Sequence, residues 1–290
     1  MLITVFTPTY NRSYTLKDLY TSLCNQTDKN FEWLIIDDGS TDCTEELIKT
    51  FISDNKINIR NYKQNNGGKH RAINSALSKA LGDLFFIVDS DDSLLPHAIE
   101  WINQQWDYIK CAKSLAGISG IRIDKNGNKI GGGNDIWNHL ESNAIDIRFK
   151  HKIKGDLAEI YKTDLLRQFP FPEFEDEKFC PEALIWNRIA QDYNLLYSYV
   201  GIYVCEYLND GLTSQIIKLR KNSPKSSMLY YSELYHYNIP IIQKFKAAIN
   251  YWRFSPLKYY PYSSKLNMIN PTSIVCLPIG VCYRILDILL

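Results

Sequence analysis

Three carboxylates stand within four residues at the end of a strongly apolar segment. Residues 84–88, LFFIV, have the composition of a buried strand, and DSDD follows directly at residues 89–92. Carboxylates this close repel one another, so the cluster is costly unless a cation compensates for it. Clustered oxygen ligands suit Mg²⁺ or Mn²⁺, which take their remaining ligands from water and substrate phosphates. The sequence therefore predicts a divalent metal site here rather than a plain turn.

Three other polar segments follow apolar strands in the first hundred residues. They are TPTYNR at 7–12, DDGSTD at 37–42 and NNGGK at 65–69. Amphipathic helices are predicted after each segment, and this alternation is typical of an α/β fold with a mainly parallel sheet covered by helices on both faces. In such sheets ligands bind beyond the carboxyl ends of the strands. We therefore expect the four polar loops to share one rim.

The residue types on this rim suit a metal-bound nucleoside diphosphate. Arg12 and Lys69 offer positive charge for phosphates, and Tyr10 offers an aromatic face for a base. Simpler interpretations stay open, because Tyr10 could pack under the sheet edge, Lys69 could be a solvated residue at a helix start, and Asp38 could be a turn residue. Asp42 could cap a helix. No GxGxxG follows the first strand, which disfavours hydride transfer with a dinucleotide.

In their order and spacing the four motifs resemble family-2 glycosyltransferases with the GT-A fold. The likeness is close over residues 1–110 and looser over residues 150–213. It implies a donor pocket in which Pro8, Tyr10 and Asp38 hold the nucleoside. Asp89 and Asp91 would form the DxD pair, with Asp89 near the ribose and Asp91 on the metal that bridges the diphosphate. The other expected donor-site residues are Arg12, Lys69 and Ser90.

The resemblance also implies inversion at the anomeric carbon, with a carboxylate that takes the proton from the acceptor hydroxyl. In the family this base comes from an acidic pair at the start of a later helix. Glu182 is the candidate, because Pro181 is well placed in the first turn of a predicted helix. The chain shows PEA where an acidic pair is expected, and the helix dipole alone favours an acid there. Residues 175–177, EDE, are expected to form a solvated loop.

The C-terminal part of the chain differs in charge from the rest. Residues 214–265 hold nine Lys or Arg and one acid, a local charge of about +8, whereas the whole chain carries +1. Aromatic residues alternate with these bases. Residues 273–290 are apolar but contain Pro278, Arg284 and Asp287, so they form a poor membrane span. We expect a helical region that contacts the membrane surface peripherally or packs on the catalytic core; both remain open.

These patterns predict a GT-A catalytic domain at 1–213, with a donor half at 1–110 and an acceptor half at 111–213, and a C-terminal helical region at 214–290. Seven cysteines show no CxxC spacing, which fits a reducing compartment. The first residues lack the features of a signal peptide. We expect a cytoplasmic protein at the inner face of the cell membrane.

The expected activity is that of a hexosyl- or N-acetylhexosaminyltransferase with a UDP-sugar donor. The expected acceptor is a hydroxyl of a glycan or lipid-linked oligosaccharide, and no nucleic-acid partner is expected. A non-catalytic nucleotide-sugar or glycan-binding protein on the same fold remains an alternative, because the acidic pair is incomplete. A nucleotide-sugar pyrophosphorylase is a weaker alternative, since the loop after the first strand has no glycine.

Overall fold

The computed structural model describes residues 1–133, 139–205, 215–256 and 261–289. The chain divides into two compact units. The first comprises residues 1–171 and 188–208, and the second comprises residues 172–187 and 209–290. The domain boundary expected between residues 213 and 214 lies outside the described residues.

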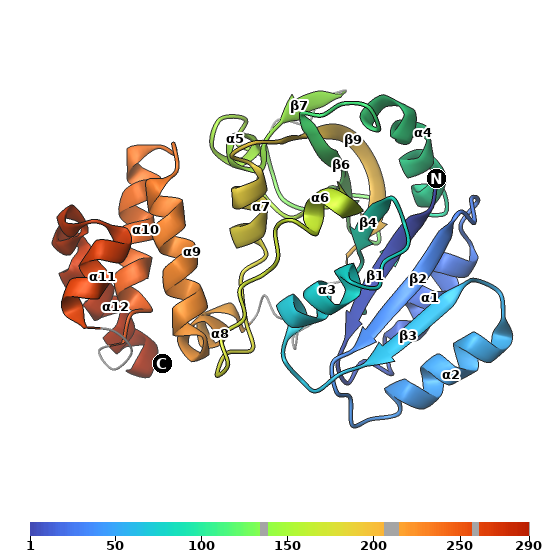
Figure 1. Ribbon diagram of the computed structural model, residues 1–290, viewed down its shortest axis with the longest axis horizontal. Coiled ribbons are helices and arrows are strands. Elements are labelled where there is room, and N and C mark those ends of the chain that lie inside the picture. Colours follow the sequence, from blue (N-terminus) through green and yellow to red (C-terminus); the bar gives the residue numbers. More distant parts are fainter. Residues whose placement is uncertain (134–138, 206–214, 257–260, 290) are drawn as a thin grey trace. The chain divides into compact units, whose positions relative to one another are not determined.

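The first unit opens with four parallel strands in the order β3-β2-β1-β4 (Figure 1). Their bounds are β1 Ile3–Thr9, β2 Phe31–Asp37, β3 Ile59–Lys63 and β4 Leu84–Ile87. Helices follow the strands in sequence, and their bounds are α1 Leu16–Cys24, α2 Thr44–Asp54, α3 Lys69–Leu77 and α4 Ala98–Ile109. Because all four strands run the same way, the polar loops that follow them meet at one edge of the sheet.

The sheet continues beyond β4 with mixed strand directions. An inner strand, β8, runs antiparallel to both β4 and β6, and β6 runs parallel to β9. The strand bounds are β5 Ser93–Leu94, β6 Leu115–Ile123, β7 Leu140–Ser142, β8 Leu157–Lys162 and β9 Asn194–Val204. The short helices are α5 Ala144–Phe149, α6 Thr163–Leu166 and α7 Ala183–Ile189. The α/β fold is confirmed, with its parallel part confined mainly to the first four strands.

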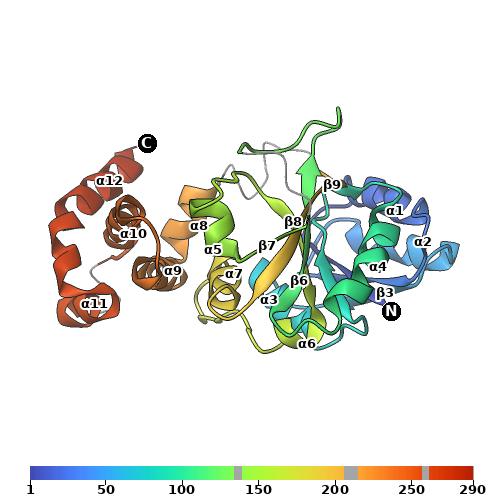
Figure 2. The ribbon, with the colours of Figure 1, turned by 90° about the horizontal axis from the view of Figure 1, so that it is seen from above.

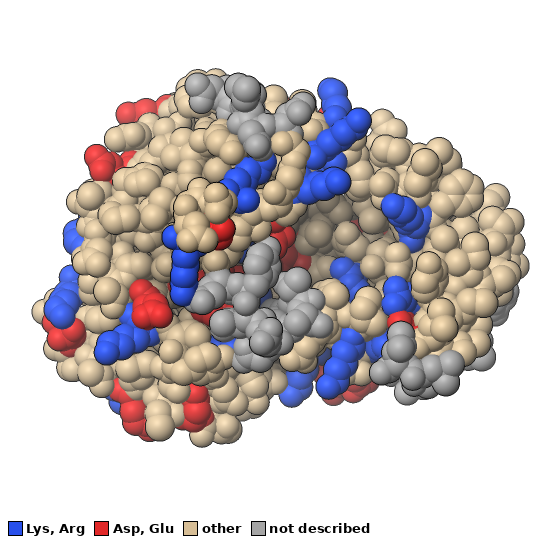
Figure 3. Space-filling view, turned by 180° about the vertical axis from the view of Figure 1, so that it is seen from behind, with Lys and Arg blue, Asp and Glu red and all other residues tan. Residues whose placement is uncertain are grey.

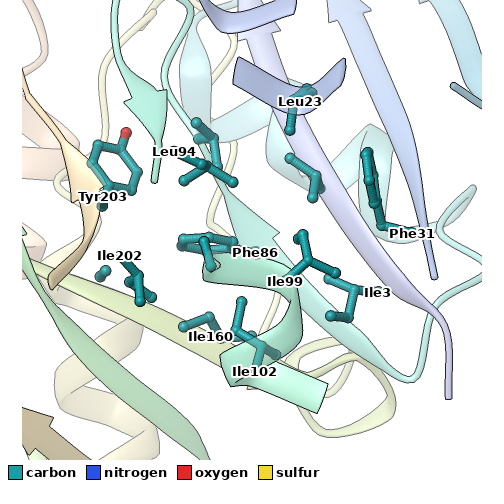
Figure 4. Packing of buried hydrophobic residues seen from close by; sticks show 14 of the residues in the cluster. Ile3, Leu23, Phe31, Phe86, Leu94, Ile99, Ile102, Ile160, Ile202 and Tyr203 are labelled. Atoms are coloured by element: carbon teal, nitrogen blue, oxygen red, sulfur yellow. The ribbon is translucent and has the colours of Figure 1, made fainter. Parts of the chain in front are cut away.

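The core of the first unit lies between the sheet and the helices that follow its strands. In Figure 4, Phe86 of β4 lies among Ile99 of α4, Ile160 of β8 and Ile202 of β9. All four side chains are fully buried. Each contributes roughly 1.5–3 kcal/mol of hydrophobic stabilisation. This packing fixes the end of β4, from which the acidic loop departs.

The second unit is helical, as the sequence predicts (Figure 2). Its elements are α8 Ile216–Asn222, α9 Pro224–His236, α10 Ile241–Arg253, α11 Tyr262–Ile269, the 3₁₀ helix η1 Pro271–Cys276 and α12 Leu277–Leu289. Its small core includes Met228, Tyr251 and Trp252. In the described part of the chain, no single helix has the length and apolar character needed to cross a membrane. Two helices joined by a 105° bend, Ser263–Ile269 and Pro271–Asp287, satisfy those criteria only as a pair.

Glu177 corrects the prediction of a solvated loop at residues 175–177. Its side chain is buried, and Oε1 accepts a hydrogen bond of 2.6 Å from the Lys225 amide. Oε2 accepts from the amide and the hydroxyl of Ser226, at 2.8 and 2.7 Å. These amides belong to the first turn of α9, where backbone donors lack helical partners and a negative charge is favoured. Glu177 therefore caps α9.

Candidate active site

The acidic loop begins just after β4 and brings Asp89 against Lys69. The Lys69 Nζ lies 2.5 Å from Asp89 Oδ1. Burial raises the pKa of Asp89, but the positive charges of Lys69 and Arg122 outweigh burial and hold that pKa below its ordinary value. Asp89 is therefore ionised at neutral pH. Lys69, the first residue of α3, is an ion-pair partner rather than a freely solvated residue.

Asp91 shows the opposite shift. Burial and the negative charge of Asp89 raise the pKa of Asp91, while the charges of Arg12 and Lys69 partly lower it. These effects require that the four side chains lie within electrostatic reach of one another. The structure thus brings together two carboxylates and two cations that come from three of the predicted polar loops.

The Asp89–Asp91 pair fits a divalent cation. Its donors are carboxylate oxygens, which Mg²⁺ and Mn²⁺ prefer. The raised pKa of Asp91 reflects burial and repulsion by Asp89, and a cation would relieve that repulsion. Over the described ranges, no group of three or more His, Cys, Asp or Glu side chains is placed to hold a metal. A cation at this pair would therefore take its other ligands from water and from a phosphate-bearing substrate.

The third acid of the loop, Asp92, is tied to β9. The hydroxyl of Tyr203 donates a hydrogen bond of 2.7 Å to Asp92 Oδ2 and accepts one of 2.9 Å from the Asp89 amide. The Arg122 guanidinium lies 4.2 Å from the Tyr203 ring centroid and 4.0 Å from Asp92 Oδ2. Burial and the charge of Asp89 raise the pKa of Asp92 to about 6. Asp92 therefore anchors the loop.

Three other predicted donor-site residues differ in exposure. Tyr10 is 48% exposed, so it does not pack under the sheet edge. Pro8 is half-buried in β1 beside Ile36 of β2, and Ser90 is buried within the acidic loop. An exposed aromatic ring next to charged groups can stack on a nucleobase. A nucleoside contact for Pro8, Tyr10 or Ser90 stays a prediction.

Hydrogen bonds join the loops at 7–12 and 37–42. Asn11 has a positive φ of 52°, its amide donates to Ser40 Oγ at 2.9 Å, and its Oδ1 accepts from the Thr41 amide at 2.8 Å. The Arg12 amide donates to Thr44 Oγ1 at 3.2 Å. Asparagine tolerates the left-handed region better than most residues, which explains its place in this tight turn. These bonds fix the backbone from which Arg12 extends.

Asp38 organises the glycine loop that leads into α3. Its side chain is buried, and Oδ1 accepts from Gln64 Nε2 at 2.8 Å and from the Gly67 amide at 2.9 Å. Oδ2 accepts from the Gly68 amide at 2.7 Å. Gly68 has φ of 93°, a region that favours glycine, and Lys69 follows it. Asp38 is therefore more than a turn residue, and its contact with a nucleoside stays a prediction.

Asp42 has a structural role, as one interpretation of the sequence expects. Its Oδ1 accepts a hydrogen bond of 3.1 Å from the Thr44 amide in the first turn of α2, and its Oδ2 accepts one of 2.8 Å from the Ser13 hydroxyl. Burial raises the pKa of Asp42, but hydrogen bonds from Thr44 and Ser13 outweigh it and lower the pKa. This carboxylate joins α2 to the loop after β1.

Glu182 belongs to the second unit and immediately precedes α7. Its carbonyl accepts hydrogen bonds from the amides of Ile185 and Trp186, at 2.9 and 3.2 Å. The residue thus starts the helix, as predicted, and its side chain is half-buried. A role for Glu182 as catalytic base stays a prediction.

Two residues next to the acidic loop escape sequence reasoning. Tyr203 and Arg122 lie on β9 and β6, at least 30 residues beyond the DSDD motif. The one available signal is a charged residue inside an otherwise apolar strand, LAGISGIRI, since a buried cation needs a partner. Nothing in the sequence says that this partner lies near Asp89 and Asp92.

Comparison with known proteins places the chain in a family. Residues 4–156, just over half of the chain, match the sequence profile described as Glycosyl transferase family 2. An uncharacterized glycosyltransferase of Haemophilus influenzae is 36% identical over 257 residues, which cover 82% of this chain and 96% of that protein. The chain belongs to glycosyl transferase family 2.

Two further comparisons extend this result. A GalNAc(5)-diNAcBac-PP-undecaprenol beta-1,3-glucosyltransferase of Campylobacter jejuni is 30% identical over 198 residues, covering 66% of this family-2 chain. The chain spans 60% of that relative's length and 35% of the length of another curated relative. The crystal structure of S. aureus TarS 1-349 in complex with UDP-GlcNAc has a TM-score of 0.69 at 19% identity, covering 98% of this chain and 88% of that one. This likeness confirms the GT-A-type fold.

Proposed function

We propose that this family-2 chain transfers a sugar from a nucleotide-diphosphate donor to a hydroxyl group, with inversion at the anomeric carbon. The arrangement at the end of β4 is the observation that carries the proposal. An ionised Asp89 paired with Lys69 lies beside Asp91, whose pKa is raised by burial and by the negative charge of Asp89. Two carboxylates next to a lysine suit the binding of a diphosphate together with a divalent metal, because the carboxylates can bind the metal and the lysine can bind phosphate oxygens.

Asp89 and Asp91 are the proposed ligands of Mg²⁺ or Mn²⁺. When bound, the cation neutralises charge on the departing diphosphate. Lys69 and Arg12 add positive charge for the phosphates, and Asp38 holds the glycine loop that carries Lys69. The exposed ring of Tyr10 is the proposed stacking surface for the base. UDP is the proposed nucleotide, supported by the UDP-GlcNAc bound to the S. aureus structure.

Glu182 is the proposed general base. The acceptor oxygen forms a bond to the anomeric carbon from the face opposite the leaving group, while the bond between that carbon and the diphosphate oxygen breaks. The proton of the acceptor hydroxyl passes to the Glu182 carboxylate, and the nucleoside diphosphate leaves with the bonding electron pair. Proton transfer of this kind contributes roughly 10²–10⁴-fold to a rate.

A glycan or lipid-linked oligosaccharide is the proposed acceptor, at the cytoplasmic face of the membrane. The Campylobacter relative supports this proposal, because its name describes a substrate carried on undecaprenol diphosphate. The basic C-terminal region would bring the enzyme to a membrane that presents such substrates.

Comparing UDP binding with UDP release in the wild type and Glu182→Gln distinguishes an enzyme that transfers sugar from a protein that only binds it. We expect this variant to bind UDP with the affinity of the wild type and to release UDP from UDP-sugar plus acceptor at least 100-fold more slowly. Glu175→Gln, at an exposed position in the same segment, serves as the matched control and is expected to retain full turnover. Equal turnover in all three proteins would remove Glu182 from the mechanism. Binding without turnover in the wild type, across a panel of glycan and polyprenol-linked acceptors, would favour a non-catalytic binding protein.

A further inference from the structure

The exposed side of η1 and α12 carries large apolar side chains between Val275 and Leu286. Val275 is 66% exposed, Ile279 48%, Tyr283 46% and Leu286 51%. Their spacing of four, four and three residues places them on one side of the helical segment. We call these four residues the α12 face. A helix on the surface of a soluble unit normally shows the reverse pattern, with apolar residues inward and charges outward.

The charges of this segment point inward instead. Arg284 and Asp287 are the two charged residues between positions 271 and 287. Arg284 donates from Nε to the Arg253 carbonyl at 2.9 Å and from Nη2 to the Ser255 carbonyl at 2.6 Å. Asp287 accepts a hydrogen bond of 2.7 Å from Arg253 Nε. The polar side of α12 is thus committed to the second unit's own interior, and its apolar side is turned outward.

The inward side of α12 also fits the second unit closely. Gly280 is buried, and a Cβ at this position would lie 2.6 Å from Trp252 Cβ and 2.7 Å from the Ile249 carbonyl oxygen. Gly280 therefore allows α12 to pack tightly on α10. Since this contact and the Arg253–Asp287 pair hold the same side of the helix, rotation of α12 about its axis cannot bury the α12 face.

A basic helix, α8, contacts α12 near its C-terminal end. Lys221 of α8 donates a hydrogen bond of 2.5 Å to the carbonyl of Asp287, near the end of α12. Lys218 and Lys221 are both exposed on α8. In Figure 3 the part of the surface formed by the C-terminal helices is mostly uncharged, with isolated basic side chains. An apolar strip with exposed lysines near one end of its helix has the chemistry of a surface that meets anionic lipid headgroups.

We propose that the α12 face docks on an anionic lipid bilayer, with α12 lying in the plane of the membrane. A helix of 13 residues is about 20 Å long, too short for a hydrocarbon core of about 30 Å, so it fits the interface rather than a span. The four apolar side chains enter the acyl boundary, and Lys218 and Lys221 contact the headgroups. This proposal rests on the proposed function in one respect: a lipid-linked acceptor would be presented at the same membrane surface.

The test is sedimentation of the full chain with lipid vesicles. We expect binding to vesicles of equal phosphatidylglycerol and phosphatidylcholine, much weaker binding to phosphatidylcholine alone, and weakening by 0.5 M NaCl. Ile279→Glu combined with Leu286→Glu should reduce binding to anionic vesicles at least tenfold. The matched control is Leu81→Glu, which charges a 64% exposed leucine of the first unit and should bind as the wild type does.

A single variant and a measurement of UDP binding guard against misfolding of the double variant. The single variant Val275→Glu, at the most exposed position of the α12 face, should also weaken vesicle binding if the double variant fails to fold. Calorimetric UDP binding, measured on the same samples, should be equal in all variants, so loss of membrane docking is distinguished from failure of the donor site. Absence of vesicle binding by the wild type, or equal binding by Val275→Glu and the wild type, would overturn the proposal. The proposal would also be overturned if the wild type formed an oligomer that Val275→Glu converts to a monomer, and if neither protein bound vesicles. The α12 face would then be a contact between copies of the chain.

Discussion

Tyr203 reaches Asp92 across 111 residues of sequence and donates a hydrogen bond of 2.7 Å to its carboxylate. The same hydroxyl accepts from the amide of Asp89, so one side chain of β9 holds the first and last acids of the loop. The Arg122 guanidinium, 4.2 Å from the Tyr203 ring centroid, supports the ring from β6. The mixed half of the sheet, through β6 and β9, thus positions the loop that follows β4 of the parallel half.

Tyr203→Phe should weaken metal-dependent UDP binding several-fold. The substitution keeps the ring against Arg122 but removes both hydrogen bonds of the hydroxyl, and a buried bond of this kind contributes about 1 kcal/mol. Calorimetry gives the UDP affinity, and urea unfolding gives the stability. Tyr20→Phe is the control, because its hydroxyl donates to Asp54 at 2.9 Å away from the acidic loop. Equal loss of UDP affinity in both variants would contradict a positioning role for Tyr203.

Glu159→Gln should change how stability depends on pH. Burial and the charge of Asp156 raise the pKa of Glu159 to about 7, against the opposing charges of Arg148 and Arg122. A raised carboxyl pKa gives stability that is fully present below the unfolded value of 4.5 and is lost as pH rises through about 7. The variant, which stays neutral, should therefore lose less stability than the wild type between pH 5 and pH 8, by about 1–3 kcal/mol.

Urea unfolding at pH 5, 6, 7 and 8 measures this difference. Glu141→Gln, at an exposed glutamate of β7, is the control and should keep the wild-type dependence on pH. Parallel stability curves for Glu159→Gln and the wild type would show that Glu159 ionises normally in the folded protein.

Glu177→Ala should destabilise the second unit by about 1–3 kcal/mol. The substitution removes the carboxylate that accepts from the amides of Lys225 and Ser226 at the start of α9, and those donors are left without their partner. Thermal unfolding followed by circular dichroism checks the loss. Glu175→Ala, two residues earlier and exposed, should stay within about 0.5 kcal/mol of the wild type. If both variants melt like the wild type, the capping role of Glu177 is wrong.

The sequence predicts the rim of the sheet because local signals locate each part of it. An apolar strand and the polar loop after it can be recognised within ten residues of sequence, as at 84–92. Because the strands are parallel, these loops lie at one edge of the sheet. The pairing of Lys69 with Asp89 follows from that geometry. The interpretation of Asp42 as a helix-capping residue also rests on a local pattern.

Local sequence patterns do not predict contacts between segments that are distant in the chain. Tyr203 stands in an ordinary strand sequence, and nothing local marks its hydroxyl as the partner of Asp92. Glu177 lies in an acidic run that resembles a solvated loop, and its target amides lie 48 and 49 residues away. Asp38 looks like a turn residue, but its oxygens bind a loop nearly 30 residues later. Each of these bonds depends on how the chain packs in three dimensions.

Calorimetric titration of UDP into the wild type and Asp91→Asn, with and without Mn²⁺, tests the central claim most directly. Asparagine keeps the size of the side chain but removes the charge that a divalent cation needs. We predict that Mn²⁺ strengthens UDP binding by the wild type at least tenfold and leaves Asp91→Asn almost unchanged, while Asp164→Asn, a charge removal at an exposed site, behaves as the wild type. Equal UDP affinity with and without Mn²⁺ in the wild type would contradict the account of a metal-bound diphosphate at Asp89 and Asp91.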